Sequence, residues 1–169
     1  MYAERCPSTQ RLLAGDAPEG AVAVADEQTQ GRGRMGRMWV APPGTSLLLS
    51  VRLRPEVAPE RLPTLTVVAA DAVCEVVAGL GLEASVKAPN DVLVADRKVA
   101  GVLAEASAGR VTLGIGLNVS QRLDELPERP VFPATSLELE LGSAPERSDL
   151  LVELLLVLER RYDAWRLAG

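Results

Sequence analysis

The most distinctive chemical feature of the sequence is a stretch in which arginine alternates with glycine, Gly31–Arg37 (GRGRMGR). Glycine lets a backbone approach a ligand closely, and the planar guanidinium group of arginine matches carboxylate and phosphate oxygens. The stretch also fits the GxGxxG pattern of dinucleotide-binding proteins, but that pattern has to open a helix. Trp39 and the pair Pro42–Pro43 follow instead, which excludes a helix there. We therefore interpret the stretch as an anion-binding loop, against the alternative of a solvated surface turn.

A second candidate for chemistry is Lys87, one of only two lysines in the chain, which comes just before Pro89, Asn90 and Asp91. A lysine held near a phosphate neutralises the charge that develops during phosphoryl or nucleotidyl transfer. The alternative for Lys87 is a solvated surface position. Asn90 and Asp91 either build the turn, which is their commoner role, or contact a nucleotide or a metal ion.

Glycines also interrupt two apolar stretches, at Gly101 and within Gly114–Val119 (GIGLNV). Glycine weakens a strand, so its presence there indicates a bulge, close packing or a ligand that crosses the backbone. Asn118 closes the second stretch, either as a strand-end residue or as a ligand contact. Trp39, just after the glycine–arginine loop, is either a core residue or a lid over an apolar ligand.

The elements that must position these residues follow from the apolar spacing. Apolar runs bounded by turn residues predict strands over Ala21–Asp26, Ser46–Leu53, Glu83–Lys87, Asp91–Ala95, Lys98–Ala106 and Val111–Val119. Helical spacing predicts one helix over Pro63–Leu80 and a second that begins at an N-cap, Ser148. The strands cluster without regular alternation with helices, so we predict an α+β fold with a mixed or antiparallel sheet flanked by helices.

Composition excludes several classes of protein. The chain has 169 residues, which suits one domain, and it contains no histidine, so a Ser–His–Asp triad and a histidine-ligated metal are excluded. Its two cysteines, Cys6 and Cys74, form no CxxC pair. A net charge of −5 argues against a general nucleic-acid binder. The N-terminus lacks a secretory signal, and charges interrupt the apolar stretches before the ~20 residues of a membrane span, so we expect a soluble, cytoplasmic protein.

Taken together, these stretches resemble the biotin protein ligase family in order and spacing. The matching segments are Ser8–Thr9, Asp26–Trp39, Lys87–Asp91, Arg97–Leu103, Gly114–Val119 and Ala134–Leu137. The resemblance covers residues 5–165 and implies the catalytic-domain fold of biotin and lipoate protein ligases. It depends on several motifs in the right order, which is far more specific than any one of them.

The resemblance also implies a reaction in two steps. Biotin's carboxylate attacks the α-phosphorus of ATP to give biotinyl-5'-AMP and pyrophosphate, with Mg²⁺ accompanying ATP. A lysine of a biotin carboxyl carrier protein, such as that of acetyl-CoA carboxylase, then attacks the mixed anhydride. Both nucleophiles come from substrates, so positioning and charge neutralisation carry the chemistry and histidine is not needed.

Site residues carry over from the resemblance position by position. Lys87 and Arg34 would be catalytic, with Lys87 bridging biotin's carboxylate and the α-phosphate. The biotin pocket would comprise Ser8, Thr9, Gln28, Gly31, Arg32, Trp39, Lys87 and Gly101. The ATP or adenylate site would comprise Arg32, Arg34, Arg37, Asn90 and Asn118. No protein ligand to a metal ion is assigned. The sequence departs from the family at Gln10, where asparagine is usual, and at Ala88, where tryptophan is usual.

The resemblance further implies a single catalytic domain over residues 1–169, without the family's N-terminal DNA-binding domain or its small C-terminal β domain. We therefore expect no repressor function and no nucleic-acid or membrane partner. An exposed strand edge could pair two copies into a homodimer. Two alternatives stay open: a lipoate or octanoate ligase or transferase of the same superfamily, and a biotin- or adenylate-binding protein that lacks transfer activity.

Overall fold

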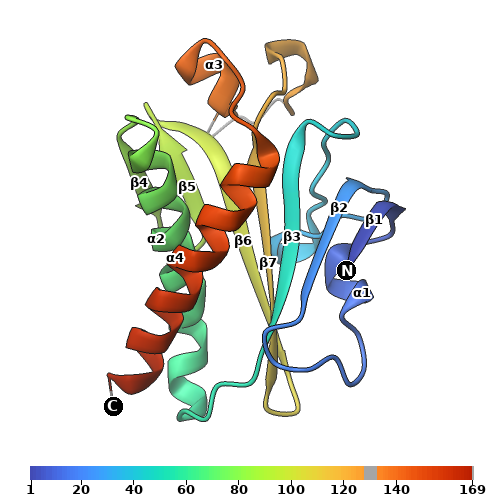
Figure 1. The fold of residues 1–169 in the computed structure, drawn as a ribbon, viewed down its shortest axis with the longest axis vertical. Coiled ribbons are helices and arrows are strands. Elements are labelled where there is room, and N and C mark those ends of the chain that lie inside the picture. The colour runs from blue at the N-terminus through green and yellow to red at the C-terminus, as the bar shows by residue number, and fades with distance from the viewer. Residues whose placement is uncertain (128–132, 169) are drawn as a thin grey trace.

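The computed structural model describes residues 1–127 and 133–168, and its centre is a seven-stranded sheet (Figure 1). The strands lie in the order β1-β2-β3-β7-β6-β5-β4. Their bounds are β1 Tyr2–Cys6, β2 Val22–Gln28, β3 Ser46–Leu53, β4 Ala84–Lys87, β5 Asp91–Val94, β6 Arg97–Ser107 and β7 Arg110–Asn118. The β1–β2 pair is parallel and the other neighbours are antiparallel, which confirms the predicted mixed sheet.

The six predicted strands are confirmed within two residues at each end, and one further strand was not predicted. That strand, β1, is a sheet edge whose residues are exposed or half-buried except for Cys6. Because little of β1 is buried, its sequence carries no apolar alternation from which a strand could be recognised.

Alternation along the central strands separates two faces of the sheet. On β3, Leu47, Leu49 and Val51 belong to the hydrophobic core, while the intervening side chains point to the opposite face. One row of residues on that opposite face runs across three strands: Gly116 of β7 lies between Leu48 of β3 and Gly101 of β6. The next row on the same face is Ser50, Gly114 and Leu103. One face is therefore uniformly apolar, and the middle of the other combines three glycines with Leu48, Ser50 and Leu103.

Two long helices cover the apolar face. They are α2 (Leu65–Gly79), preceded by a 3₁₀ turn at Pro59–Thr64, and α4 (Arg147–Leu167), and they pack against each other as well as the sheet (Figure 1). The short helix α1 (Thr9–Leu12) and the glycine–arginine loop contribute to the opposite face, where a cavity lies. Another short helix, α3 (Leu137–Leu141), precedes α4.

The charges that interrupt the apolar stretches include Asp71 and Glu75, which lie within α2. In the described part of the chain, Pro59–Gly79 is long and apolar enough by length and composition to cross a membrane. In the structure, α2 buries Leu65, Val73 and Val77 in the core beneath the sheet. Packing within the domain accounts for its apolar composition.

The predicted start of α4 also needs correction. The N-cap is Glu146 rather than Ser148, and no side chain there bonds to the helix end. Arg147 instead bonds from the first turn to Asp26 on β2, with 2.7 Å between Nη1 and Oδ1. This long-range ion pair ties the first turn of the helix to the sheet, and a local sequence pattern does not contain it.

Candidate binding and active site

A cavity of about 370 Å³ lies on the glycine-bearing face of the sheet, a size that suits a small-molecule ligand. Its walls come from α1, the end of β2, the glycine–arginine loop, the β4–β5 turn and strands β3, β6 and β7. The residues that line it are Ser8, Thr9, Gln10, Gln28, Arg32, Gly33, Arg34, Met35, Arg37, Met38, Trp39, Leu49, Ser50, Lys87, Ala88, Pro89, Asn90, Asp91, Lys98, Gly101, Val102, Leu103, Gly114, Ile115 and Gly116.

The glycine–arginine loop forms a tight hairpin over this cavity. The backbone N–H of Trp39 donates to Gly31 O at 3.0 Å, and that of Gly33 donates to Arg37 O at 2.8 Å. At the tip, Met35 and Gly36 both have positive φ values, of 58° and 73°. A Cβ on Gly31 would lie 2.3 Å from the carbonyl oxygen of Trp39, so the base of the hairpin closes only with glycine at this position.

The strand glycines make room for three of the protein's own side chains, Trp39, Gln10 and Lys98. A Cβ on Gly116 would come within 2.6–2.9 Å of the Trp39 ring, and one on Gly101 within 3.0 Å of it. A Cβ on Gly114 would lie 3.1 Å from Gln10 Nε2. Pairing of β7 with its neighbours is regular, so the expected alternative of a bulge is wrong. Trp39 therefore lies flat on the sheet as part of the cavity wall.

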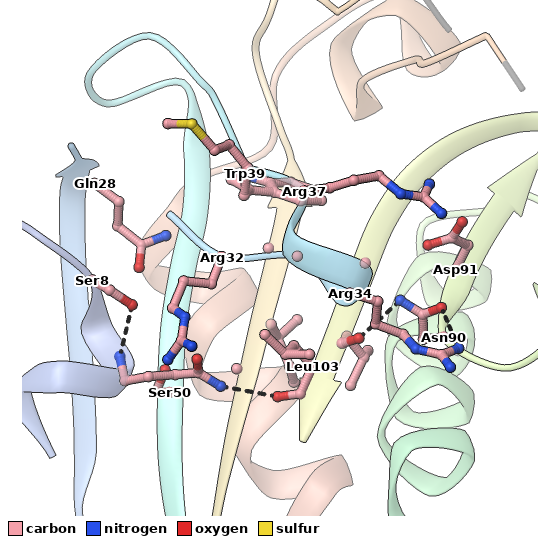
Figure 2. A pocket seen from close by; sticks show the side chains of 18 of the residues that line it. Ser8, Gln28, Arg32, Arg34, Arg37, Trp39, Ser50, Asn90, Asp91 and Leu103 are labelled. Carbon is pink, nitrogen blue, oxygen red and sulfur yellow. Dashed lines mark hydrogen bonds between the residues drawn. The ribbon is translucent and has the colours of Figure 1, made fainter. Parts of the chain in front are cut away.

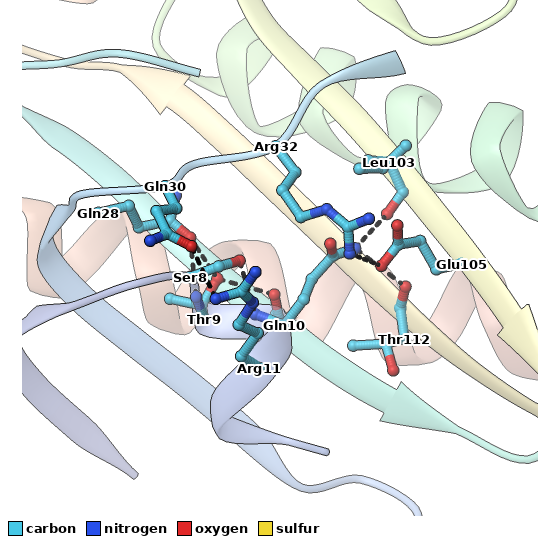
Figure 3. Close-up of polar contacts among 11 residues, drawn as sticks. Ser8, Thr9, Gln10, Arg11, Gln28, Gln30, Arg32, Leu103, Glu105 and Thr112 are labelled. Carbon is cyan, nitrogen blue, oxygen red and sulfur yellow. Dashed lines mark hydrogen bonds and ion pairs between the residues drawn. The ribbon is translucent and has the colours of Figure 1, made fainter. Parts of the chain in front are cut away.

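At one end of the cavity the polar groups are uncharged and joined by hydrogen bonds. Thr9 donates to Gln28 Oε1 from its backbone N–H at 2.8 Å and from its hydroxyl at 3.1 Å. The Thr9 and Ser50 hydroxyl oxygens are 2.8 Å apart. The Ser8 hydroxyl accepts from Gln10 N at 3.3 Å. Figure 3 shows Ser8, Thr9, Gln10 and Gln28 gathered here.

These bonds determine what this neutral end can offer to a ligand. Gln28 Oε1 already accepts two bonds, so Gln28 presents its amide N–H donors. The Ser8 oxygen accepts from a backbone N–H, which leaves its own O–H proton as a donor. The neutral end therefore offers two donors suited to a ligand carbonyl.

The opposite end of the cavity is cationic. Arg34 donates to Asn90 Oδ1 at 3.4 Å, and Asn90 is itself held by its Nδ2, which donates to Val102 O at 3.0 Å. Figure 2 shows Arg34 and Arg37 extending to the side on which Asn90 and Asp91 lie. Cationic side chains around a pocket attract carboxylate or phosphate oxygens.

A second lysine, which was not among the predicted site residues, also lines the cationic end. Lys98 is 8% exposed and its Nζ lies 2.5 Å from Asp91 Oδ1 and 5.6 Å from the centre of the Trp39 ring. Lys87, which was predicted, lines the same cavity but is exposed. Lys98 follows a turn at the start of β6, and only the pairing of β5 with β6 brings it beside Asp91.

Arg32 lies apart from the other two arginines of the loop. Its Nη1 is 3.0 Å from Glu105 Oε2 on β6, and it extends towards the neutral end, where Ser8 and Ser50 lie (Figures 2 and 3). The three arginines therefore do not form one cluster. Arg34 and Arg37 occupy the cationic end, and an acidic side chain balances the charge of Arg32.

Two of the predicted site residues do not line this cavity. Gly31 supports the base of the hairpin instead. Asn118 is buried at the end of β7, where its Nδ2 donates to Thr135 O at 2.9 Å and its Oδ1 accepts from Gln121 Nε2 at 3.0 Å. The other predicted residues line this one cavity, and the ligand contacts assigned to all of them stay predictions. Residues 128–132 lie outside the described part of the chain.

The fold and site define an α+β domain with a cavity of small-molecule size, which carries neutral hydrogen-bonding side chains at one end and cationic side chains at the other. The chain belongs to the biotin/lipoate A/B protein ligase family, whose sequence model matches residues 2–121. Membership confirms the resemblance seen in the sequence.

Curated relatives and solved structures agree with this placement. The chain is 41% identical to the biotin--[acetyl-CoA-carboxylase] ligase of Mycobacterium tuberculosis, over 94% of this chain and 60% of that protein. It is 38% identical to the bifunctional ligase/repressor BirA of Bacillus spizizenii, over 96% of this chain and 53% of that protein. It thus spans little more than half the length of these relatives. The biotin protein ligase of Aquifex aeolicus, solved with biotin and ATP, superposes with a TM-score of 0.90 at 33% identity, over all of this chain and 72% of that one.

Proposed function

We propose that the protein is a biotin protein ligase, which activates biotin with ATP to biotinyl-5'-AMP and then transfers biotin to a lysine of a biotin carboxyl carrier protein. The observation that carries this proposal is the division of one cavity into a neutral hydrogen-bonding end and a cationic end, with Trp39 and bare glycine backbone between them. Biotin has the same sequence of parts: a ureido group, an apolar chain and a carboxylate.

Each part of biotin has a chemical counterpart in the cavity. Donors from Ser8 and Gln28 suit the ureido carbonyl, and Thr9 holds Gln28 in that orientation. The Trp39 ring, lying on Gly101 and Gly116, suits the apolar chain. The biotin carboxylate would then reach the cationic end.

The cationic end supports the adenylation step. A carboxylate oxygen forms a bond to the α-phosphorus of ATP while the bond from that phosphorus to the bridging oxygen breaks and pyrophosphate leaves. Lys87 and Arg34, our proposed catalytic residues, would neutralise the charge on the phosphate, and Lys98 would add a cation inside the cavity. In the second step a carrier lysine amine attacks the acyl carbon, and AMP leaves with the electron pair of the broken bond.

ATP would bind across the same end through Arg34, Arg37 and Asn90, with Asn118 approaching the adenylate. Arg32, also assigned to ATP, pairs with Glu105 towards the neutral end and would have to leave that pair to reach the nucleotide. Mg²⁺ would arrive with ATP. Among the described residues there is no group of three or more acidic or cysteine side chains that could hold a metal ion. We therefore expect the ion to be coordinated mainly by phosphate oxygens and water, as is usual for Mg²⁺ on nucleotides.

The carrier we propose is the biotin carboxyl carrier subunit of an acetyl-CoA carboxylase or a similar enzyme. One relative's name specifies acetyl-CoA carboxylase as the acceptor, and the same chemistry needs an accessible lysine amine on a folded carrier domain. We propose no nucleic-acid partner and a soluble, cytoplasmic location for this catalytic unit.

The test is biotin-dependent exchange of labelled pyrophosphate into ATP, followed by transfer of labelled biotin to a carrier domain. We expect exchange with biotin and transfer to the carrier lysine. Absence of exchange despite tight biotin binding would contradict the ligase proposal and leave a binding protein. Exchange stimulated by lipoate or octanoate in place of biotin would assign the chain to the other branch of the family.

A further inference from the structure

The neutral end of the cavity contains one buried acceptor that its surroundings leave unsatisfied. Gln10 is 8% exposed, and its Oε1 has no hydrogen-bond partner among the described residues. Buried polar side-chain atoms in native proteins nearly always have a partner, so an isolated one in a cavity wall indicates a group that a ligand supplies.

The neighbours of Gln10 fix which side of its carboxamide is the oxygen. Nε2 donates to the carbonyl oxygen of Leu103 at 3.1 Å and to that of Thr112 at 3.4 Å (Figure 3). Because both neighbours are acceptors, only the NH₂ group fits there, and a flipped amide is excluded. Gln10 can therefore offer a ligand only its acceptor.

Gly114 allows this placement. A Cβ at Gly114 would lie 3.1 Å from Gln10 Nε2 and 3.3 Å from Cδ, closer than most real Cβ contacts. With glycine beneath it, the carboxamide lies against β7 and stays anchored to backbone carbonyls on two strands. Gln10 is thus a rigid feature of the cavity wall and not a flexible side chain.

We propose that Gln10 Oε1 accepts a hydrogen bond from a ureido N–H of biotin and thereby determines the choice of a cyclic urea over a plain acyl chain. This inference rests on the proposed function. Ser8 and Gln28 present donors for the carbonyl of a urea, and Gln10 adds the acceptor that its N–H requires. A dithiolane ring or an alkyl chain has no N–H and leaves Oε1 buried and unpaired, which penalises such ligands strongly.

The test compares ligand affinities of the wild-type chain and Gln10→Met by isothermal titration calorimetry. Methionine has a similar length but no amide, so we expect the Kd for biotin to rise about tenfold, the effect of one lost neutral hydrogen bond. Octanoate affinity should not fall. Biotin derivatives methylated at one ureido nitrogen or the other should show a preference in the wild type that Gln10→Met abolishes.

Two further variants keep the result interpretable. Gln30→Met makes the same chemical change at an exposed residue outside this cavity and should leave the biotin Kd unchanged. Gly114→Ala displaces the Gln10 carboxamide while keeping its acceptor. It should therefore raise the Kd for biotin in the wild type, but much less in the Gln10→Met background.

The outcomes separate this inference from the proposed function. The role of Gln10 would be overturned if folded Gln10→Met protein bound biotin with the wild-type Kd. It would also be overturned if Gly114→Ala changed the biotin Kd equally in both backgrounds. Either result would leave the ligase proposal intact. A wild-type chain that binds no biotin would overturn the proposed function, and the inference with it.

Discussion

At the scale of single residues, the two lysines of the chain have different environments although both line the cavity. Lys98 is buried between Asp91 and the Trp39 ring, whereas Lys87 is exposed at the β4–β5 turn. A cation acts more strongly on developing charge where water is excluded, because the effective dielectric constant is lower. We therefore expect Lys98 to affect adenylation at least as much as Lys87, which the sequence singled out.

Substituting each lysine tests this order. We predict that Lys98→Met lowers the biotin-dependent exchange rate by about 10²-fold, the size expected when one charge-stabilising group is lost. Lys87→Met should also lower it strongly, as expected for a catalytic residue, but by a smaller factor, since solvent screens an exposed charge. Arg166→Met, which removes an exposed cation of an α4 ion pair with Asp163, is the control and should retain the wild-type rate. A larger loss from Lys87→Met would contradict the order.

At the scale of elements, a polar cluster joins the helical layer to the edge of the sheet. Asp26 on β2 accepts from the Tyr2 hydroxyl on β1 and pairs with Arg147 at the start of α4. The backbone carbonyl of Asp26 also accepts from Gly44 N, just beyond the glycine–arginine loop. The Tyr2 hydroxyl, followed by the Arg147 guanidinium, holds the pKa of the Asp26 carboxyl below its usual value.

This cluster predicts a dependence of stability on pH. Because the folded-state pKa of Asp26 lies below the unfolded value of about 3.9, its contribution is complete above that value and is lost as the pH falls through the folded pKa. Asp26→Asn should lower the free energy of unfolding by about 1 kcal/mol at pH 7, and the difference from wild type should shrink below about pH 4. Urea unfolding at several pH values measures both.

The matched control is Asp16→Asn, which removes a carboxylate paired with Arg110 on the surface. The Asp16 side chain is 90% exposed, so water screens the pair and little stability should be lost. If the difference in unfolding free energy between wild type and Asp26→Asn stayed constant with pH, the assigned role of the carboxylate would be contradicted.

At the scale of the whole molecule, the cavity joins segments that are far apart in the sequence. Residues 8–10, Gln28 and Ser50 form its neutral end, and residues 32–39 form the hairpin, whose Arg34 and Arg37 reach the cationic end. Residues from 87 to 116 form the rest of the cationic end and the floor. A ligand that contacts both ends bridges the first quarter of the chain and the sheet centre. Such a ligand should stabilise the fold as one unit rather than order a single loop.

Thermal unfolding measures this coupling. Biotin at a hundred times its Kd should add about 2.7 kcal/mol to the folded state, which corresponds to a rise in Tm of about 5–10 °C for a chain of this size. Octanoate at the same concentration should raise Tm much less, since it has no polar head for the neutral end. A comparable rise with octanoate would contradict the assignment of that end to a ureido group.

The sequence by itself determined the class of fold, most element boundaries and the family. Apolar periodicity is a local property of the sequence, so alternation predicted six strands and helical spacing predicted both long helices. It failed at β1, which buries almost nothing, and at the start of α4, where no side chain caps the helix and Arg147 bonds to distant Asp26 instead. The glycine–arginine loop was recognised because its composition is unusual over a short span.

Only the tertiary structure decided how those residues divide the cavity. The sequence could not show that Arg32 pairs with Glu105 instead of clustering with Arg34. Nor could it show that Lys98 is more buried than Lys87. It could not show that Trp39 lies on Gly116, or that Leu103 and Thr112 anchor the Gln10 amide. Each of these contacts joins residues from separate elements, so it depends on strand pairing and packing, which no local pattern encodes.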